Sequence, residues 1–479
     1  MPNISYTGRD ARLIKQELVR AIPLLTRDWT DFHVSDPGMA LVDLISYVGD
    51  NLSFYLDRMA LESIYETAQE RKNILSSLKM FGYIPRGYNC AQTSVKLRSA
   101  HSHEIYIKEY DVFTTDEEDG EVFYFVATED VTLPPVEWEM TEIPLMEGIK
   151  REYLLEESNL DTRKRFNLGK DPLGENSIRL FVDGVEWQRV PEIYFNTAQE
   201  GVFGLDYDPE GTLYLKLPRS YILSDPGTVS PEFKIVALET IGSRANFGQR
   251  TITKIISDLE DEFGNTDCVK YIADILHEDY VSGGDNPESV EEIRKNAPKK
   301  LRSLWTACTL QDFEDLAETF PGISKALALD WSIEGSGIEE AYIMDLIIVP
   351  KGDGNVSSLT KDALKLFLME RRIAPLKFSI LDPEFNEIDV EVVVTVRRTF
   401  QNRASLRFRI IDFIKDYFLF EKRSFGEVIR PVELRKAIEE EFDPVLYAEI
   451  LDPEFNVVLS LREFARLNSL KVTVVEEEE

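Results

Sequence analysis

Cysteine, histidine and long apolar runs are scarce in this sequence. Its 479 residues include three cysteines, far apart at positions 90, 268 and 308, and four histidines. An odd number of widely spaced cysteines argues against a disulfide framework and predicts reduced thiols in a cytoplasmic setting. The longest apolar run, around residues 343–349, is far shorter than the roughly 18 residues that a membrane helix needs. Because no secretory signal pattern is visible either, we expect a soluble globular protein.

Positive charge is also in short supply. The chain has 54 Lys and Arg against 87 Asp and Glu, a net charge of −33. Binding to DNA or to an anionic membrane is not expected, because phosphate contacts need clustered cations. The net charge is not spread evenly along the chain. Residues 1–100 hold 12 basic and 11 acidic side chains, whereas residues 101–160 hold 3 basic and 17 acidic ones. The near-neutral first hundred residues are either a module that another protein covers, or part of an ordinary solvated surface.

Motifs for catalysis and for cofactors are missing as well. The sequence has no P-loop, no G-x-G-x-x-G and no G-x-S-x-G. The glycine pair at 283–284 is followed by acidic residues that would repel a phosphate, and residues 206–211 imitate an EF-hand whose glutamate position is Leu217. His101 and His103 alternate on a predicted strand and are interpreted as a surface pair. We therefore expect no enzyme activity, no catalytic residue, no metal site and no cofactor.

The first ninety residues have the periodicity of helices. A first helix begins near residue 10, and Pro23 is expected to interrupt or end it. Asp36 and Pro37 form the start signal of a second helix, whose apolar residues are spaced 4, 3, 4, 3 and 4 apart. These residues are Leu41, Ile45, Val48, Leu52, Tyr55 and Met59. The spacing is that of a coiled coil, and the seam lies either inside this chain or against a partner helix of another subunit.

A third helix is expected from residue 61 to residue 80, with Gly82 as its left-handed end. Gly82, Pro85 and Gly87 then lead to the first strand, near residue 94. Glycine absorbs backbone rotation and Pro85 prevents extension of the helix, so these three residues are a candidate hinge. The alternative is an ordered loop that packs against the next domain.

Beyond residue 90 the period of the apolar residues changes to two. Strand-like runs at 94–98, 121–126, 177–182 and 212–217 indicate a β-rich middle domain. From residue 283 onward helices and strands mix. Helices are expected at 289–304, 311–320, 359–372, 406–420 and 432–442, and strands at 325–331, 342–349, 388–396, 447–451 and 470–475.

The C-terminal part also contains an internal echo. Residues 314–330 are matched by residues 436–452 at an offset of 122, and LDPEFN occurs at 381–386 and at 451–456. We therefore predict an α+β multidomain chain with an N-terminal helical module, a β-rich middle and two related mixed α/β modules at the C-terminal end. The expected domains are residues 1–90 (a bundle-forming helical module), 91–280, 281–386 and 387–479.

An ordered set of motifs resembles baseplate-J-like wedge proteins of contractile-tailed bacteriophages. The motifs are YTGRD (6–10), SDPGMALVDLISYVGDNLSFYLD (35–57), TAQERKNIL (67–75), FGYIP (81–85), GSRAN (242–246), GGDNPES (283–289), EIRKNAP (292–298), TLQDF (309–313), FPG (320–322) and FGEVI (425–429). The resemblance covers both ends of the chain and is weakest between residues 100 and 270.

This resemblance implies a structural role in the inner ring of a baseplate. It implies N-terminal helices that join helices of partner wedge subunits, and C-terminal domains that pair into a ring of six wedges, with a dimer of this chain in each wedge. Other expected partners are wedge subunits and sheath-initiating or hub proteins, in a virion tail baseplate assembled in the host cytoplasm. The ring would pass the signal that triggers sheath contraction.

Two other interpretations stay open. An acidic carbohydrate-binding or glycoside-hydrolase tail protein would show a concave cleft of aromatic and carboxylate side chains in the β-rich middle. The equivalent component of a bacterial contractile injection system would have the same sequence features as the phage protein.

Overall fold

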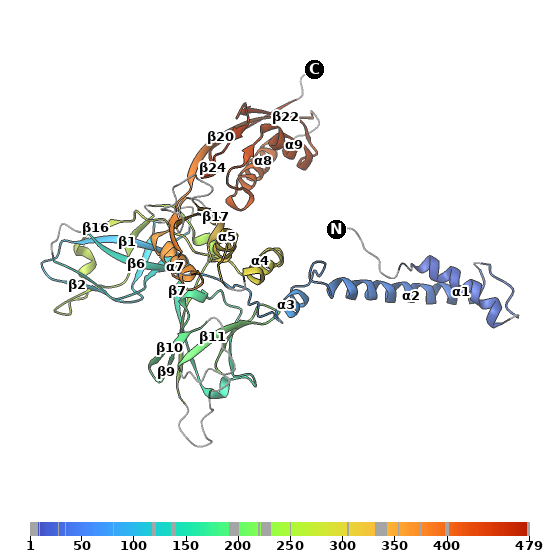
Figure 1. Cartoon of the computed structure of the whole chain (residues 1–479), viewed down its shortest axis with the longest axis horizontal. Helices are drawn as coiled ribbons and strands as arrows, with labels where there is room; N and C mark the ends of the chain where they lie inside the picture. The colour runs from blue at the N-terminus through green and yellow to red at the C-terminus, as the bar shows by residue number, and fades with distance from the viewer. Residues whose placement is uncertain are drawn as a thin grey trace. The chain divides into compact units, whose positions relative to one another are not determined.

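The structure is a computed structural model in which a helical N-terminal region is followed by a β-rich middle and by a C-terminal part where helices and strands alternate (Figure 1). It describes residues 8, 10–26, 28–33, 35–79, 81–116, 121–135, 140–190, 201–218, 221, 231–249, 251–303, 306–330, 343–352, 354–373, 376–397 and 402–476. The α+β class, with a helical N-terminal region followed by a β-rich body, is confirmed.

The chain divides into two compact units. The first holds Met1–Pro85, Tyr207–Thr212 and Ser289–Arg294, and the second holds Arg86–Asp206, Leu213–Glu288 and Lys295–Glu479. The division into four domains that the sequence suggests stays a proposal.

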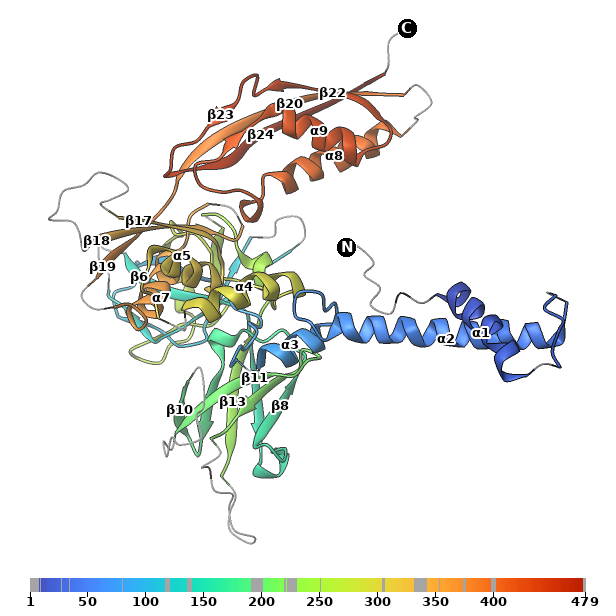
Figure 2. The same cartoon turned by 45° about the vertical axis from the view of Figure 1, so that its right-hand side comes forward.

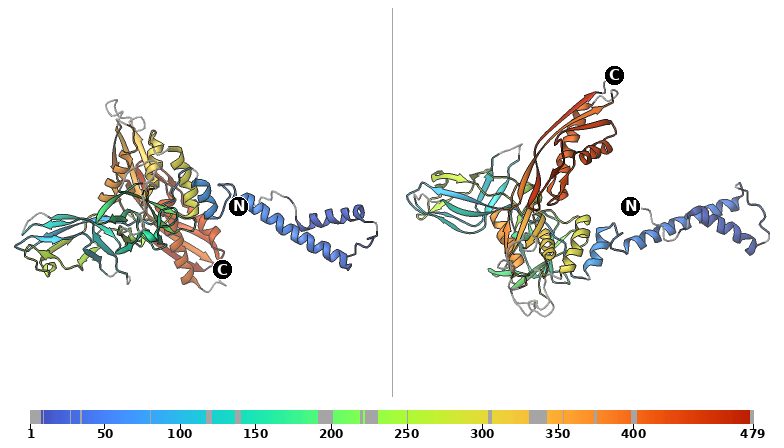
Figure 3. Two further views of the ribbon diagram at one scale, coloured as in Figure 1. Left: turned by 90° about the horizontal axis from the view of Figure 1, so that it is seen from below. Right: turned by 45° about the horizontal axis from the view of Figure 1, so that its top comes forward.

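The first unit is built on a hairpin of two helices, α1 (Ala11–Leu25) and α2 (Pro37–Glu62), which lie side by side in both views of Figure 3. The predicted start of α2 is confirmed: Asp36 Oδ1 accepts the Gly38 N–H at 2.8 Å, and Pro37 occupies the first turn. The helical hairpin thus forms where the capping signals place it.

Two expectations about helix ends in this unit are wrong. Pro23 lies inside α1 and does not end it. Proline has no backbone N–H to donate to the residue four positions earlier. Because α1 ends at Leu25, only one hydrogen bond of its last turn is lost. The helix expected from residue 61 to residue 80 is shorter: α3 covers Arg71–Lys79, and Met80 lies outside the described residues.

The chain turns after α2 because a carboxylate binds the free amides ahead of α3. Glu62 accepts the backbone N–H groups of Gln69 and Glu70 at 3.0 and 3.1 Å, and the Asn73 amide at 2.9 Å. Burial alone would raise the pKa of Glu62, but these hydrogen bonds lower it. Gly82 follows α3 with φ +76°, as expected for a left-handed helix end.

In its described residues, the β-rich part of the second unit contains three sheets. The strands are β1 (Gln92–Ser99), β2 (Ile105–Ile107), β3 (Val112–Thr115), β4 (Tyr124–Ala127), β5 (Val131–Leu133), β6 (Thr141–Glu147), β7 (Ile149–Leu155), β8 (Arg165–Gly169), β9 (Arg179–Val182), β10 (Val185–Arg189), β11 (Val202–Tyr207), β12 (Leu213–Lys216), β13 (Phe233–Glu239), β14 (Ile252–Ile255), β15 (Glu260–Asp261) and β16 (Ile272–Leu276). Their orders are β14-β3-β4-β6-β1-β16, β7-β13-β9-β10-β11-β12-β8 and β15-β2-β5. The four strand-like runs found in the sequence all contribute strands.

The C-terminal part of the second unit contains two further sheets with helices. The elements are α4 (Val290–Ser303), α5 (Leu310–Thr319), β17 (Ile323–Asp330), β18 (Ile343–Pro350), α7 (Ser358–Met369), β19 (Lys377–Leu381), β20 (Glu384–Val396), α8 (Arg403–Tyr417), β21 (Val428–Ile429), α9 (Pro431–Glu441), β22 (Val445–Asp452), β23 (Val457–Val458) and β24 (Glu463–Glu476). The first turn of α4 belongs to the helical unit. Figure 2 shows α8 and α9 together on one face of the β22-β20-β24 sheet.

The internal echo corresponds to the same local structure in both copies. The last residue of α5 lies 122 positions before the last residue of α9. The first and last residues of β17 likewise lie 122 positions before those of β22. In each sheet the echoed strand is an edge that pairs antiparallel with a central strand, which pairs parallel with the third strand. The chain order differs, because β18 follows β17 whereas β20 precedes β22. Descent of the two modules from one ancestor stays a proposal.

Large apolar cores stabilise the second unit. One lies between the six-stranded sheet and the β15-β2-β5 sheet, around Phe113 and Phe125. Another lies between β18 and helices α5 and α7, and another between β20 and helices α8 and α9. Fully buried apolar side chains provide the largest favourable term in folding. In the described part of the chain, no helix is both long enough and apolar enough to span a membrane.

Glu147, at the end of β6, is a buried carboxyl group. It accepts hydrogen bonds from the Thr240 hydroxyl and, at 3.2 Å, from the Ile241 N–H. Burial raises its pKa from 4.5 to about 7, although both hydrogen bonds act to lower it. The folded protein therefore keeps this proton to higher pH than the unfolded chain does. Stability should fall as the pH rises from about 4.5 to about 7.

Replacing Glu147 by glutamine should remove this pH dependence while keeping an acceptor oxygen. Relative to the parent, Glu147→Gln should gain on the order of 3 kcal/mol between pH 5 and pH 8. Calorimetric melts at the two pH values measure the difference. Glu142→Gln, an exposed change on the same strand, is the control and should leave the profile unchanged. If Glu147→Gln also leaves it unchanged, the carboxyl group is not the source of the effect.

Candidate functional site

The most exposed apolar surface of the helical unit lies on α2. The six predicted seam residues, Leu41, Ile45, Val48, Leu52, Tyr55 and Met59, are between 51% and 68% exposed. Only Met39, Val42 and Ser46 of α2 are buried. In the isolated chain the seam is therefore open to solvent.

The packing of α1 explains why the seam stays open. Gly49 of α2 lies against the Ile14 side chain of α1, and α1 covers the side of the helix that carries Met39, Val42 and Ser46, next to the seam. Lys15 of α1 also binds Asp43 of α2 at 2.5 Å. Because the heptad positions point elsewhere, α1 cannot fill the seam.

The exposed apolar surface is wider than the heptad pattern predicts. Leu44 and Leu56 extend the seam, and Tyr47 and Phe54 on another side of α2 are about 60% exposed. A helix that is apolar almost all round is normally buried. Tyr47 and Phe54 are not at heptad positions, so the spacing of the seam does not predict their exposure. Two large aromatic residues on the polar side of a predicted helix are the feature of the sequence that could have indicated it.

The candidate hinge residues lie at the boundary between the two units. Pro85 is the last residue of its segment in the helical unit, and Arg86 is the first of the second unit. Gly87 is held inside the second unit, where its N–H donates to Glu175 Oε1 at 2.5 Å. The hinge stays a prediction, and any rotation at Gly87 would first have to break this bond.

A buried charged joint in the second unit brings together motifs that are far apart in the sequence. Asp285 is buried and accepts from Arg86 and from Lys351, each at 2.9 Å, and from the Gly322 N–H at 3.2 Å. Its backbone N–H and C=O pair with those of Asn89 at 3.0 Å. The carboxylate of the GGDNPES motif therefore connects three distant segments.

Close backbone contacts surround this joint. The side chain of Asn246, from the GSRAN motif, both donates to and accepts from the backbone of Gly284, at 2.8 and 2.9 Å. A Cβ atom on Gly322, in the FPG motif, would overlap the backbone of Gly283. The glycine pair at 283–284, the best match in the sequence to a phosphate loop, is thus a tightly packed corner.

Glu288 extends the joint. Burial alone would raise its pKa, but the positive charges of Lys300 and Arg86 hold the pKa below its usual value. Glu288 also accepts the Arg86 N–H at 3.1 Å and the Asn296 amide at 2.8 Å. All these charges have partners inside the protein, so the joint is a structural element.

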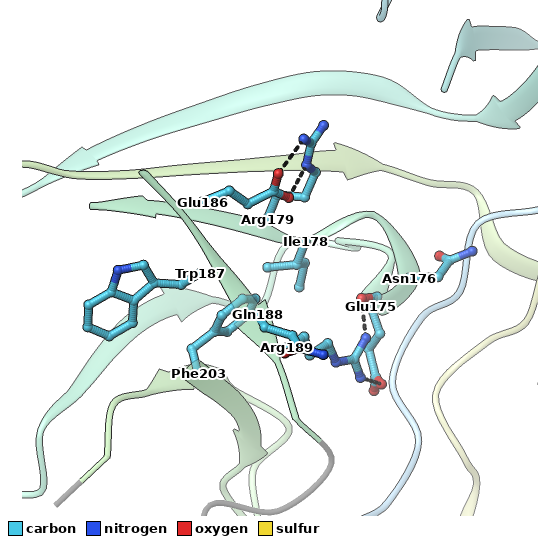
Figure 4. Close-up of a pocket in the computed structure, with 9 residues that line it drawn as sticks. All are labelled: Glu175, Asn176, Ile178, Arg179, Glu186, Trp187, Gln188, Arg189 and Phe203. Carbon is cyan, nitrogen blue, oxygen red and sulfur yellow. Dashed lines mark hydrogen bonds and ion pairs between the residues drawn. The ribbon is translucent and has the colours of Figure 1, made fainter. Parts of the chain in front are cut away.

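The β-rich body has a hollow of about 440 Å³ beside β9 and β10, where the carbohydrate alternative would be sought (Figure 4). Trp187 and Phe203 line it together with two charged pairs. Arg179 binds Glu186 through two bonds of 2.6 and 2.7 Å, and Arg189 binds Glu175 at 2.8 Å.

Both carboxylates of the hollow are already held by arginine. The bonds to Arg179 also lower the pKa of Glu186. A glycosidase needs a carboxyl group with a raised pKa as its general acid. The hollow therefore contains aromatic and carboxylate groups, as the alternative requires, but in a form that does not suit acid catalysis.

The two histidines interpreted as a surface pair lie in a loop after β1, so their placement on a strand was wrong. The ring centroids of His101 and His103 are 5.5 Å apart. Among the residues that the structure describes, no three His, Cys, Asp or Glu side chains are grouped so that they could hold a metal ion.

Comparisons with known proteins bear on the helical unit first. Residues 11–80 match the family model described as the N-terminal domain of bacteriophage baseplate proteins. The chain is also similar to the baseplate wedge protein gp6 of Enterobacteria phage T4, with 23% identity over 417 residues. This match covers 81% of the chain and 61% of gp6, so the chain spans less than two thirds of the length of that relative. The resemblance to baseplate wedge proteins is confirmed.

A similar chain also occurs in the cryo-EM structure of the anti-feeding prophage baseplate, 6-fold symmetrised. The alignment covers 95% of this chain and 90% of that chain, at 10% identity and a TM-score of 0.35. This TM-score is too low to establish a common fold.

Proposed function

We propose, from the match of residues 11–80 to the N-terminal domain of bacteriophage baseplate proteins, that this chain is a structural wedge subunit of a contractile-tail baseplate. The observation that carries the proposal is the open seam on α2, within the matched segment. Exposed apolar surface of this extent marks a protein–protein contact. The expected partners are a second copy of the chain, other wedge subunits, and sheath-initiating or hub proteins. The same role applies in a phage tail and in a bacterial injection system.

The finer part of the proposal concerns assembly and signalling. The α2 seam joins partner helices, and the C-terminal modules make the ring contacts of six wedges, each with a dimer of this chain. Movement of the helical unit about residues 82–87 would let two copies take different arrangements and relay the signal for sheath contraction. No catalytic step, cofactor, metal, nucleic acid or membrane is part of this function.

Reconstitution tests the proposal. The chain is coexpressed with the other wedge proteins of its own tail or injection system, and the products are sized by light scattering and imaged by electron microscopy. We expect it to enter a wedge complex and rings built from such complexes. A chain that stays monomeric with every partner, and that degrades bacterial polysaccharide through Glu175 or Glu186, would favour the hydrolase instead. Glu175→Gln and Glu186→Gln variants identify such activity.

A further inference from the structure

A row of four aromatic rings lies at the end of the small β15-β2-β5 sheet, in the second unit. The rings are those of Phe263, His103, His101 and Tyr271, and together they form the aromatic row. Successive centroids are 4.8, 5.5 and 4.3 Å apart. Edge-to-face and tilted contacts at these distances are favourable. The four side chains therefore form one continuous surface.

The aromatic row is open to solvent. Phe263 is 68% exposed and Tyr271 38%, and the His103 side chain is 43% exposed. Large exposed aromatic side chains that touch one another are unusual on a monomer and common at binding sites. The row lies outside the helical unit, and the proposed wedge function does not use it.

The backbone beneath Phe263 is held in one conformation. Asp261 Oδ1 accepts the N–H groups of Phe263 and Asn265, each at 2.9 Å, and Asp261 Oδ2 accepts the Asn265 amide at 2.7 Å. Gly264 completes the turn with φ +81°. These bonds present the Phe263 ring without a large loss of conformational entropy on binding, as an interface anchor requires.

The loop that carries the two histidines is also held by hydrogen bonds. The Ala100 N–H donates to the Tyr271 carbonyl at 2.8 Å, which ties the histidine loop to the end of the row. His103 Nδ1 lies 2.8 Å from Glu262 Oε1, and the His103 N–H donates to His101 Nδ1 at 3.3 Å. The row is thus a prearranged surface.

Charge around the row selects the partner. Residues 258–274 contain six carboxylates and one cation, Lys270, which binds Asp267. Lys108 binds Glu260 and Arg98 binds Asp274 from neighbouring strands, so six negative charges against three positive ones leave a net charge of −3 around the row. The row already holds one cation–π contact, since the Lys270 Nζ lies 5.2 Å from the centre of the Tyr271 ring. A cation beside an aromatic face is stabilised by the ring, and an arginine also stacks on it.

We propose that the aromatic row is a docking surface for a basic segment of a neighbouring protein, with an arginine side chain on Phe263. The carboxylates around the row attract the segment and suppress acidic partners. The rings supply the anchor that fixes where it binds.

The four histidines of the chain allow a direct test. Protein labelled with ¹³C at histidine Cε1 gives one signal each for His33, His101, His103 and His277, assigned from single His→Gln variants. A synthetic glycine–serine peptide with two arginines is added at fixed ionic strength. We expect saturable shifts of the His101 and His103 signals and none of the buried His277 or of His33. A peptide with two glutamates should cause no shift.

Two phenylalanine variants decide whether the row is the anchor. Phe263→Ala should weaken binding of the arginine peptide about two- to fivefold, the loss of one exposed cation–π contact. Phe455→Ala, a similarly exposed ring in the C-terminal part, should leave the affinity unchanged. An unchanged His277 signal shows that each variant is folded. Equal shifts of all four histidines, or unaltered affinity in Phe263→Ala, would mean that the peptide responds to the acidic surface alone, and the proposal would be wrong.

Discussion

Replacing Leu52 by aspartate is expected to abolish entry of the chain into a wedge complex while leaving the melting temperature of the isolated chain unchanged. Leu52 lies in the middle of the seam and is 59% exposed. In the free chain the new carboxylate stays in water. In a complex it would be buried against apolar side chains, at a cost of several kcal/mol. That penalty corresponds to a loss of affinity of at least a hundredfold.

An exposed residue of α1 provides a matched control. Gln16 is exposed and lies outside α2, which carries the apolar surface. Gln16→Asp adds the same charge and should assemble nearly as well as the parent. Size-exclusion chromatography of coexpressed wedge proteins measures assembly, and calorimetry of each variant alone measures stability. Earlier melting of isolated Leu52→Asp would place the seam inside the chain and contradict its role in assembly.

Removing the Asp285 carboxylate should strongly destabilise the second unit. Asp285→Ala leaves Arg86 and Lys351 without their shared partner. Breaking a buried ion pair from one side typically costs about 3–5 kcal/mol, because an uncompensated charge stays buried. The melting temperature of the second unit should fall by about 5 °C.

An exposed ion pair serves as the comparison. Asp267 binds Lys270 at 2.6 Å, but its side chain is 83% exposed. Asp267→Ala should therefore change stability by less than about 1 kcal/mol. Calorimetry and urea unfolding of both variants measure the difference. Equal effects of the two changes would show that the joint contributes no more than a surface pair.

The sequence predicted the features that depend on local spacing. The heptad positions from Leu41 to Met59 follow from a strict period, and the start of α2 follows from the Asp36 and Pro37 signal. The helix–turn–strand echo could be read at its true offset because both copies keep the same apolar positions.

Features made by distant residues could not be read in this way. The joint at Asp285 depends on Arg86, about 200 residues earlier, and on Lys351, on another segment. Nothing in the sequence pairs these three charges, although the glycine-rich motifs around them indicated close backbone packing. Likewise, the end of α2 depends on where the Glu62 carboxylate finds free amides, and the pattern of apolar residues continues across that turn.

The length of α2 limits what its partner can be. At 1.5 Å per residue, the seam from Leu41 to Met59 is about 27 Å long, or five helical turns. A segment shorter than this would leave part of the apolar surface in water. A partner should therefore be recognisable from its own sequence, as a helix with at least two and a half heptads of uninterrupted apolar a and d positions. Candidate genes beside the one for this chain can be ranked by that property before any protein is made.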